Sequence, residues 1–128
     1  MSAWTESDLT TIGDATELQA TSRRKDGSLR NYVTIWGVRV GDDIFVRSAY
    51  GADNPWFRRA VTAGAGRVRA GGVERDVTFI RVGPDSSTHS DIDAAYHTKY
   101  DRYGPQIVGS VVGEHATEVT LRLDPHIS

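Results

Sequence analysis

Three tight turns constrain the fold of this chain more than any other feature. Asp26-Gly27, the segment 41–43 and Gly71-Gly72 each separate two strand-like stretches. Glycine or aspartate in so short a turn supplies the backbone angles of a β-hairpin. Parallel strands, by contrast, need a crossover of a dozen or more residues, usually a helix. The sequence therefore predicts an antiparallel, hairpin-built sheet and argues against a parallel Rossmann sheet.

Six strands and three short helices are predicted. The longest strand shows clear alternation, which puts Trp36 and Val38 on one face and Val33 and Ile35 on the other. The predicted strands span residues 18–23, 29–40, 44–49, 68–70, 73–82 and 117–123, and the predicted helices span about 5–15, 54–64 and 90–104. This order of elements favours a small antiparallel barrel with helices on its flanks.

Bulk properties narrow the class of protein. A chain of 128 residues is expected to form one domain, residues 1–128, with a real hydrophobic core. The net charge of −2 argues against general nucleic-acid binding. The absence of cysteine excludes disulfides, a cysteine metal site and a cysteine nucleophile. We expect no membrane-spanning segment and no secretory signal at the N-terminus, so the expected location is the cytoplasm.

Positive charge is concentrated in two segments, residues 22–30 and 47–59. Together they hold seven of the fifteen basic residues. If hairpin geometry brings the two segments together, they form a site for an anion such as a phosphate. The alternative is that these side chains are simply solvated, as surface charges usually are.

The second basic segment has further features of a binding loop. Ser48 can donate a hydrogen bond, Gly51 allows a ligand to approach the backbone, and a helix begins at Asn54-Pro55. Arg58 lies in the first turns of that helix, where a cation is unfavourable to the helix dipole, so another benefit is expected there. We expect Trp56 to be a core anchor rather than a ligand contact.

Other groupings of polar residues indicate structure rather than chemistry. Asp93, His97 and Asp101 are spaced by four and are expected to form a solvated ladder of ion pairs, not a metal site. Ser90 and Asp93 have the spacing of a helix capping box. No serine lies in a nucleophile-elbow context, and no catalytic residue can be assigned.

Three motifs taken together resemble a known superfamily. The hairpin 23–30 is similar to the Gly-Arg-Lys-Ser-Gly-x-x-Arg hairpin of deazaflavin-dependent reductases, and residues 48–56 are similar to their Ser-Lys-Gly-Gly element followed by Pro and Trp. Residues 69–73 resemble their Val-Gly-Gly-type hairpin. From about residue 9 to 125 the chain thus resembles the split β-barrel flavin-binding superfamily of pyridoxamine-phosphate oxidases and deazaflavin-dependent nitroreductases, and most of all its members of unknown function.

This resemblance implies a single six-stranded antiparallel split β-barrel of the FMN-binding type. It implies an oxidoreductase-like protein that binds FMN or a deazaflavin and acts on a small molecule, and a homodimer with the ligand near the subunit interface. The cofactor contacts implied are Arg24, Lys25, Gly27, Arg30, Trp36, Ser48, Tyr50, Gly51 and Arg58, with Trp36 and Tyr50 as the wall for the ring.

The chain also departs from the superfamily pattern. Asp26 replaces a serine beside the expected phosphate, and Ala49 stands where those reductases often have lysine. The proline expected shortly after Arg30 is absent. Asp26 and Ala49 favour two alternatives: a barrel that binds or transforms another small ligand without flavin, and a purely structural dimerisation domain.

Overall fold

The computed structural model describes residues 4–49 and 51–126. Its helices are α1 (Glu6–Asp14), α2 (Pro55–Ala63), α3 (Thr88–Tyr100) and α4 (Pro105–Val108), with 3₁₀ turns at Asp101–Tyr103 and Glu114–Val119. Its strands are β1 (Leu18–Ser22), β2 (Val33–Ile35), β3 (Gly37–Val40), β4 (Asp43–Arg47), β5 (Ala65–Ala70), β6 (Val73–Arg81) and β7 (Thr120–Pro125).

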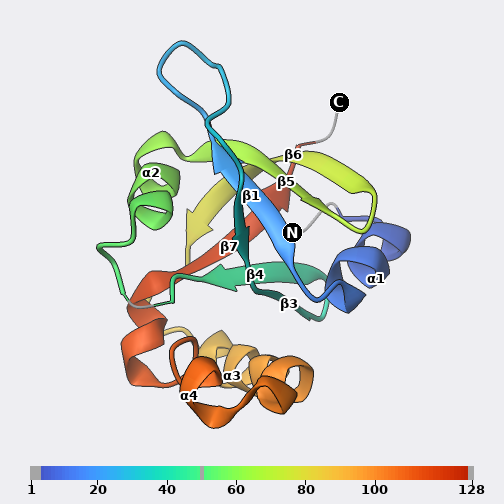
Figure 1. The fold of residues 1–128 in the computed structure, drawn as a ribbon, viewed down its shortest axis with the longest axis vertical. Helices are drawn as coiled ribbons and strands as arrows, with labels where there is room; N and C mark the ends of the chain where they lie inside the picture. The colour runs from blue at the N-terminus through green and yellow to red at the C-terminus, as the bar shows by residue number, and fades with distance from the viewer. Residues whose placement is uncertain (1–3, 50, 127–128) are drawn as a thin grey trace.

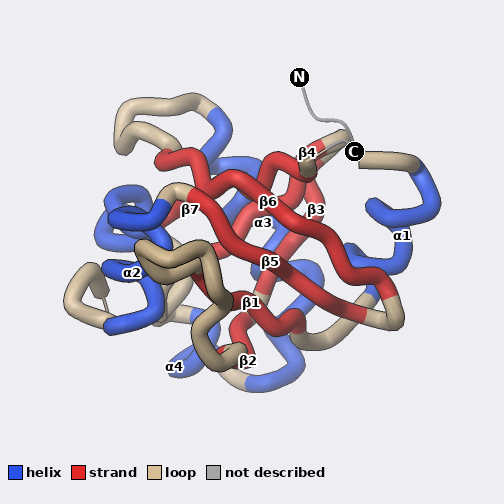
Figure 2. Tube along the Cα trace, turned by 90° about the horizontal axis from the view of Figure 1, so that it is seen from above, coloured by secondary structure: helices blue, strands red, loops and turns tan. Residues whose placement is uncertain are grey.

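All the strands belong to one antiparallel sheet in the order β2-β1-β5-β6-β7-β4-β3. The two edge strands, β2 and β3, are consecutive in the chain and only Trp36 separates them. The sheet therefore curls until its edges meet, and it forms a nearly closed barrel with α1, α2 and α3 on its flanks (Figures 1 and 2). The prediction of an antiparallel barrel is confirmed, but the predicted number of six strands is wrong, since the described part of the chain has seven.

The seventh strand arises because the predicted strand 29–40 is broken at Trp36. β2 pairs with β1, whereas β3 pairs with β4. The chain crosses from one edge to the other at Gly37, where an added Cβ would lie 2.4 Å from Cδ2 of Leu18. A larger residue at this crowded bend would require the Leu18 side chain to shift. Alternation of side chains continues through such a bend, so the pattern alone could not reveal it.

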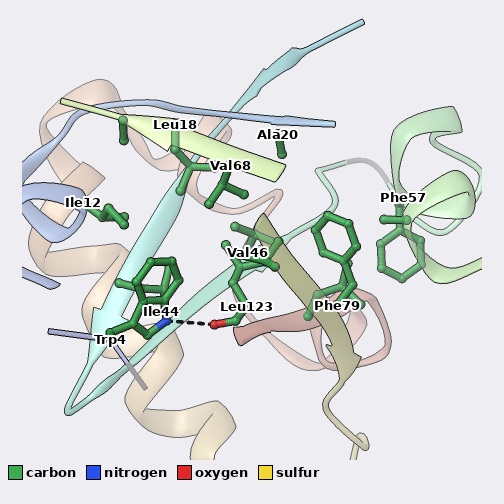
Figure 3. Close-up of a cluster of buried hydrophobic side chains, with 14 of the residues drawn as sticks. Trp4, Ile12, Leu18, Ala20, Ile44, Val46, Phe57, Val68, Phe79 and Leu123 are labelled. Atoms are coloured by element: carbon green, nitrogen blue, oxygen red, sulfur yellow. Dashed lines mark hydrogen bonds between the residues drawn. The ribbon is translucent and has the colours of Figure 1, made fainter. Parts of the chain in front are cut away.

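The core lies inside the barrel and is extended beneath α3. β4 supplies both parts, because Ile44 and Val46 point into the barrel while Phe45 points outward to α3. Trp4 closes one end of the barrel, and its Nε1 donates a hydrogen bond to the carbonyl oxygen of Leu123 at 2.9 Å (Figure 3). In the described part of the chain every buried polar side-chain atom has a hydrogen-bond partner.

Two predicted boundaries near the C-terminus differ from the structure. α3 begins at Thr88, two residues before the predicted start, and the side chain of Asp93 points to Arg47 instead of capping the helix. The last strand begins at Thr120, because the preceding residues form a 3₁₀ turn. None of the helices in the described segments has the length and apolar character needed to cross a bilayer.

Candidate anion-binding cleft

The first basic segment forms a hairpin that extends beyond the barrel (Figure 1). Its turn is closed by hydrogen bonds from the backbone N–H of Arg24 to the carbonyl of Ser28 at 2.8 Å and from Gly27 to Arg24 at 2.9 Å. Gly27 has a φ of 87°, which a glycine adopts without strain. This is the turn that Asp26-Gly27 predicts.

The second basic segment continues into α2, which lies beside the base of the hairpin (Figures 1 and 2). Pro55 opens the helix as predicted, and Gly64 ends it in a left-handed conformation. Phe57 and Ala60 are buried against the barrel. The intervening positions, Arg58 and Arg59, consequently face outward and are exposed.

The hairpin and α2 enclose an open cleft of about 780 Å³. It is lined by Arg23, Arg24, Lys25, Arg30, Pro55, Arg58, Arg59, Thr62 and Ala63. Six of these nine residues are cationic and none is acidic. Four of the predicted cofactor contacts, Arg24, Lys25, Arg30 and Arg58, thus come together in one place; their role in binding stays a prediction.

Most of the cations in this cleft have no partner in the protein. Arg23 pairs with Asp76 at 3.0 Å, and Arg24 donates to the carbonyl oxygen of Leu29 at 2.9 Å. Among the Arg and Lys side chains of residues 4–49 and 51–126, four make no hydrogen bond, ion pair or ring contact: Lys25, Arg30, Arg58 and Arg59. Every other Arg and Lys side chain has at least one such interaction. Among the described residues, the Arg and Lys side chains without a partner are therefore all collected in this cleft.

Asp26 carries its negative charge outside the lining of the cleft. Its Oδ1 accepts hydrogen bonds from the backbone N–H and the hydroxyl of Ser28, at 2.9 and 2.7 Å. These two hydrogen bonds, with the charge of Arg24 as a smaller cause, lower the pKa of Asp26. The carboxylate is engaged within its own turn and does not line the cleft.

A small apolar hollow of about 20 Å³ lies next to the cleft and shares Arg30 and Arg59 with it. Trp56 and Phe79 form part of its wall. As predicted, Trp56 packs on the barrel core, but it remains half-buried and not fully enclosed. Trp56 thus lies close to the cations, in a hollow large enough for about one water molecule.

The other predicted contacts lie outside the lining of this cleft. Trp36 stacks on Tyr100 of α3 with ring centroids 4.0 Å apart and planes 9° apart. Ser48 is buried, and its hydroxyl donates to the carbonyl oxygen of Gly51 at 2.6 Å. Gly27 lies at the exposed tip of the hairpin, and Tyr50 lies outside the described residues. The structure therefore groups the charged contacts, whereas Trp36 packs elsewhere, against α3.

One cation of the second segment has a role that sequence reasoning missed. Arg47 is 2% exposed, and its guanidinium donates to the hydroxyl of Thr120 at 2.9 Å and the carbonyl of Val111 at 2.9 Å, and pairs with Asp93. Its Nη2 also lies 3.1 Å from Nδ1 of His89. The burial of Arg47 could have been predicted from strand alternation, because residues 45 and 47 lie on the same side of β4, the side that faces α3.

The contacts of His89 fix its tautomer. Its Nε2 lies 2.8 Å from the carbonyl oxygen of Gly83, which can only accept, so Nε2 carries the proton. Nδ1 then accepts a hydrogen bond from Arg47.

Of the predicted ion-pair ladder on α3, only His97 and Asp101 are joined, at 2.7 Å. The described residues contain no group of three or more His, Cys, Asp or Glu side chains that could hold a metal.

Comparison with solved structures identifies the barrel type. The haem storage protein HutZ from Vibrio cholerae superposes with a TM-score of 0.68 at 14% identity, over 96% of this chain and 91% of that one. A structure described as an F420 reductase gives a TM-score of 0.56 at 12% identity, over 97% of both chains. A FAD-binding protein from Mesorhizobium loti gives 0.55 at 18% identity, over 97% of this chain and 91% of that one. These likenesses show the split-barrel fold that the resemblance implies.

Sequence comparison gives one assignment. No curated protein matches the chain. Residues 8–123 match DUF2255, a family described as uncharacterized and conserved in bacteria. The match spans nearly the whole described chain, from the first helix into the last strand. The chain therefore belongs to the DUF2255 family, whose member described here is a split β-barrel with an electropositive cleft between its first hairpin and α2.

Proposed function

We propose that this protein binds a flavin nucleotide or a deazaflavin through the phosphate-bearing part of the molecule, and that it is an oxidoreductase-like protein acting on a small substrate. The observation that carries the proposal is the set of unpartnered cations, Lys25, Arg30, Arg58 and Arg59, in a cleft without a carboxylate. Arginine and lysine in such a setting form strong charge-assisted hydrogen bonds to phosphate.

The residues present fit such a ligand. The cations would hold the phosphate, and Trp56 beside them offers an apolar surface to a ring. A bound flavin would supply the hydride or electron chemistry, while the chain binds, orients and shields it. Support also comes from two proteins of the same fold, one described as an F420 reductase and one as FAD-binding. We propose a homodimer as the working form.

A second candidate is a barrel that binds another small anion without flavin. The placement of Trp36 favours it, because this ring is already stacked on Tyr100 and the cleft holds anion contacts without that wall. Haem, which HutZ stores, is less well matched, since no histidine lines the cleft. The two candidates share the anion contacts and differ in whether a ring system contributes to affinity.

Titration of the purified protein with FMN, FAD and a deazaflavin nucleotide tests the proposal. We expect micromolar or tighter binding of at least one of them. Arg30→Ala and Arg58→Ala should each weaken binding about tenfold or more, the worth of one hydrogen bond between charged groups. Arg102→Ala is the matched control, because Arg102 is exposed on another face and contacts Tyr103.

Circular dichroism should show all three variants folded, because none of these side chains is buried. Lack of binding by all three nucleotides would exclude the flavin proposal. An unchanged dissociation constant in both cleft variants would show that a bound nucleotide occupies another site.

A further inference from the structure

We propose that Lys99 is a covalent binding site for a small uncharged aldehyde, which enters a pocket between α1, β3 and α3 and forms an imine with Nζ of this residue. The pocket is separate from the cationic cleft, because the two share no lining residue. The inference therefore goes beyond the proposed function and does not depend on it.

Lys99 lines an open pocket of about 410 Å³. The pocket lies where α1 and α3 both pack against β3. α1 approaches β3 closely here, since an added Cβ at Gly13 would lie 3.2 Å from the Cβ of Arg39. The volume falls within the roughly 300–1,000 Å³ that is typical of small-molecule sites. The residues that line the pocket are Leu9, Thr10, Gly13, Asp14, Val38, Arg39, Ala95, Thr98 and Lys99.

The amine of Lys99 has no counter-ion among the described residues. Its Nζ donates a hydrogen bond to the carbonyl oxygen of Gly37 at 2.7 Å, and no carboxylate lies within ion-pair distance. Burial lowers the pKa of Lys99 to about 8, and the charge of Asp14 opposes this shift as the smaller effect. A larger share of this amine than of a solvated lysine is therefore uncharged near neutral pH, and the uncharged amine is the nucleophile.

The titratable groups around the amine leave it free to react. The ring centroid of Tyr100 lies 5.1 Å from Nζ, and burial raises the pKa of this phenol, so it stays protonated and supplies no counter-charge. The guanidinium of Arg39 is held by both carboxylate oxygens of Glu6. Asp14 is the one carboxylate in the described lining, and its negative charge favours the protonated form of an imine.

The lining also determines which carbonyl compound fits. Leu9, Val38 and Ala95 offer apolar surface. An anionic ligand would meet Asp14, while Arg39 is already neutralised by its own partner, so an uncharged aldehyde is favoured. In the reaction, the lone pair of Nζ attacks the carbonyl carbon and a C–N bond forms. The carbonyl oxygen then leaves as water with the two hydrogens of the amine, so the imine forms without an oxidant or a reductant.

Reductive trapping at neutral pH tests the proposal. Butyraldehyde is the probe, and cyanoborohydride delivers a hydride to the imine carbon, which makes the adduct a stable secondary amine. Mass spectrometry of peptides compares Lys99 with Lys25, the other lysine of the chain, which is exposed. We expect initial labelling of Lys99 to be about tenfold or more faster than that of Lys25, because more of its amine is uncharged.

The dependence on aldehyde concentration separates binding in the pocket from reactivity alone. Labelling of Lys99 should saturate, because the aldehyde binds before it reacts, while labelling of Lys25 stays proportional to concentration over the same range. Equal rates at the two lysines, or a rate at Lys99 that does not saturate, would overturn the proposal.

Two tryptophan variants on α3 assign the effect to the pocket. Thr98→Trp places a bulky ring in the lining and should slow labelling of Lys99 about tenfold or more while leaving Lys25 unchanged. Ala94→Trp is the matched control, since this position is exposed on the same helix but does not line the pocket. Circular dichroism should show both variants folded, because both positions are exposed. Equal labelling of Lys99 in the two variants would overturn the assignment to the pocket.

Discussion

Arg47 is buried, and Lys99 of α3 is half-buried. Burial of a charge costs several kcal/mol unless hydrogen bonds and an opposite charge compensate it. Arg47 is fully compensated, by Asp93, Thr120, His89 and a backbone carbonyl. This network joins β4, β7 and α3 and engages all three nitrogens of the Arg47 guanidinium.

Lys99 is compensated much less well. Its Nζ donates to the carbonyl oxygen of Gly37 at 2.7 Å and lies 5.1 Å from the centroid of the Tyr100 ring. No carboxylate is within ion-pair distance of it in the described residues. Burial lowers the pKa of Lys99 to about 8, although Asp14 opposes the shift. The folded protein therefore releases this proton more readily than the unfolded chain does.

Replacing Lys99 by methionine should change how stability depends on pH. Between pH 8 and 10.5 the unfolded chain binds the Lys99 proton and the folded protein has lost it, so the wild type gains stability as pH rises. The Lys99→Met variant has no titratable group at this position and therefore no such gain. The free energy of unfolding of the wild type, minus that of the variant, should therefore rise across this window.

Urea denaturation at pH 7, 8, 9 and 10 measures this difference. The pKa values of Tyr96 and Tyr100 are raised by burial, and both tyrosines are present in either protein, so their effects largely cancel. Thr98→Met, at an exposed position of the same helix, removes no titratable group and is the control, so it should give a flat difference. A flat difference for Lys99→Met would mean that Lys99 keeps an ordinary pKa.

At the scale of the elements, Gly66 is the glycine with the least room for a side chain among those described. β5 pairs with β1 so tightly there that an added Cβ would lie 2.0 Å from the carbonyl oxygen of Thr21 and 2.8 Å from Cε2 of Phe79. Neither the strand backbone nor the packed ring can move easily. The pairing of β5 with β1 therefore requires a glycine at position 66, even though the backbone there has the usual extended conformation of a strand.

Gly66→Ala should consequently destabilise the protein by about 3 kcal/mol or more, because it overpacks a strand pair against backbone. Gly27→Ala is the matched control. Gly27 has a φ of 87° but nothing within 4 Å of an added Cβ, so its cost is only the left-handed conformation, about 1–2 kcal/mol. The midpoints of urea denaturation give both values. Equal costs would mean that the sheet yields at Gly66.

The elements that the sequence predicted well are those with local signals. Asp26-Gly27 and Gly71-Gly72 turn the chain as expected, and Pro55 and Gly64 mark the ends of α2. These residues act through their own backbone preferences, which neighbours hardly alter. The sequence also allowed the prediction that the hairpin and α2 lie close together, because tight turns make each strand pair with the one before it.

Features that depend on distant partners could not be predicted. The break at Trp36 depends on how Gly37 packs against Leu18. Asp93 is drawn from its expected capping role by Arg47, 46 residues away in the sequence. Which cations of the cleft lack partners also depends on the folded sheet, because Asp76 of β6 neutralises Arg23 and leaves Arg30 free.

At the scale of the whole molecule, two hydrophobic clusters share one strand. The first fills the barrel and the second lies between the barrel and α3. In β4, Val46 belongs to the first cluster and its neighbour Phe45 belongs to the second. β4 cannot leave either cluster without disturbing the other. This arrangement favours a single cooperative unit, as expected for a chain of one domain.

The three tryptophans can test this cooperativity, because each reports on a different layer. Trp4 lies in the barrel core, Trp36 packs against the cluster under α3, and Trp56 packs on the barrel from α2. Three variants, each keeping one tryptophan and replacing the other two by phenylalanine, would be unfolded in urea. Within each variant we expect the fluorescence midpoint to coincide with the midpoint from far-ultraviolet circular dichroism, which serves as the internal control for the altered stability. If the Trp36 fluorescence transition instead came at a lower urea concentration than the loss of the circular dichroism signal, α3 and its cluster would unfold separately from the barrel. The packing of β4 in both clusters would then be too weak to couple their unfolding.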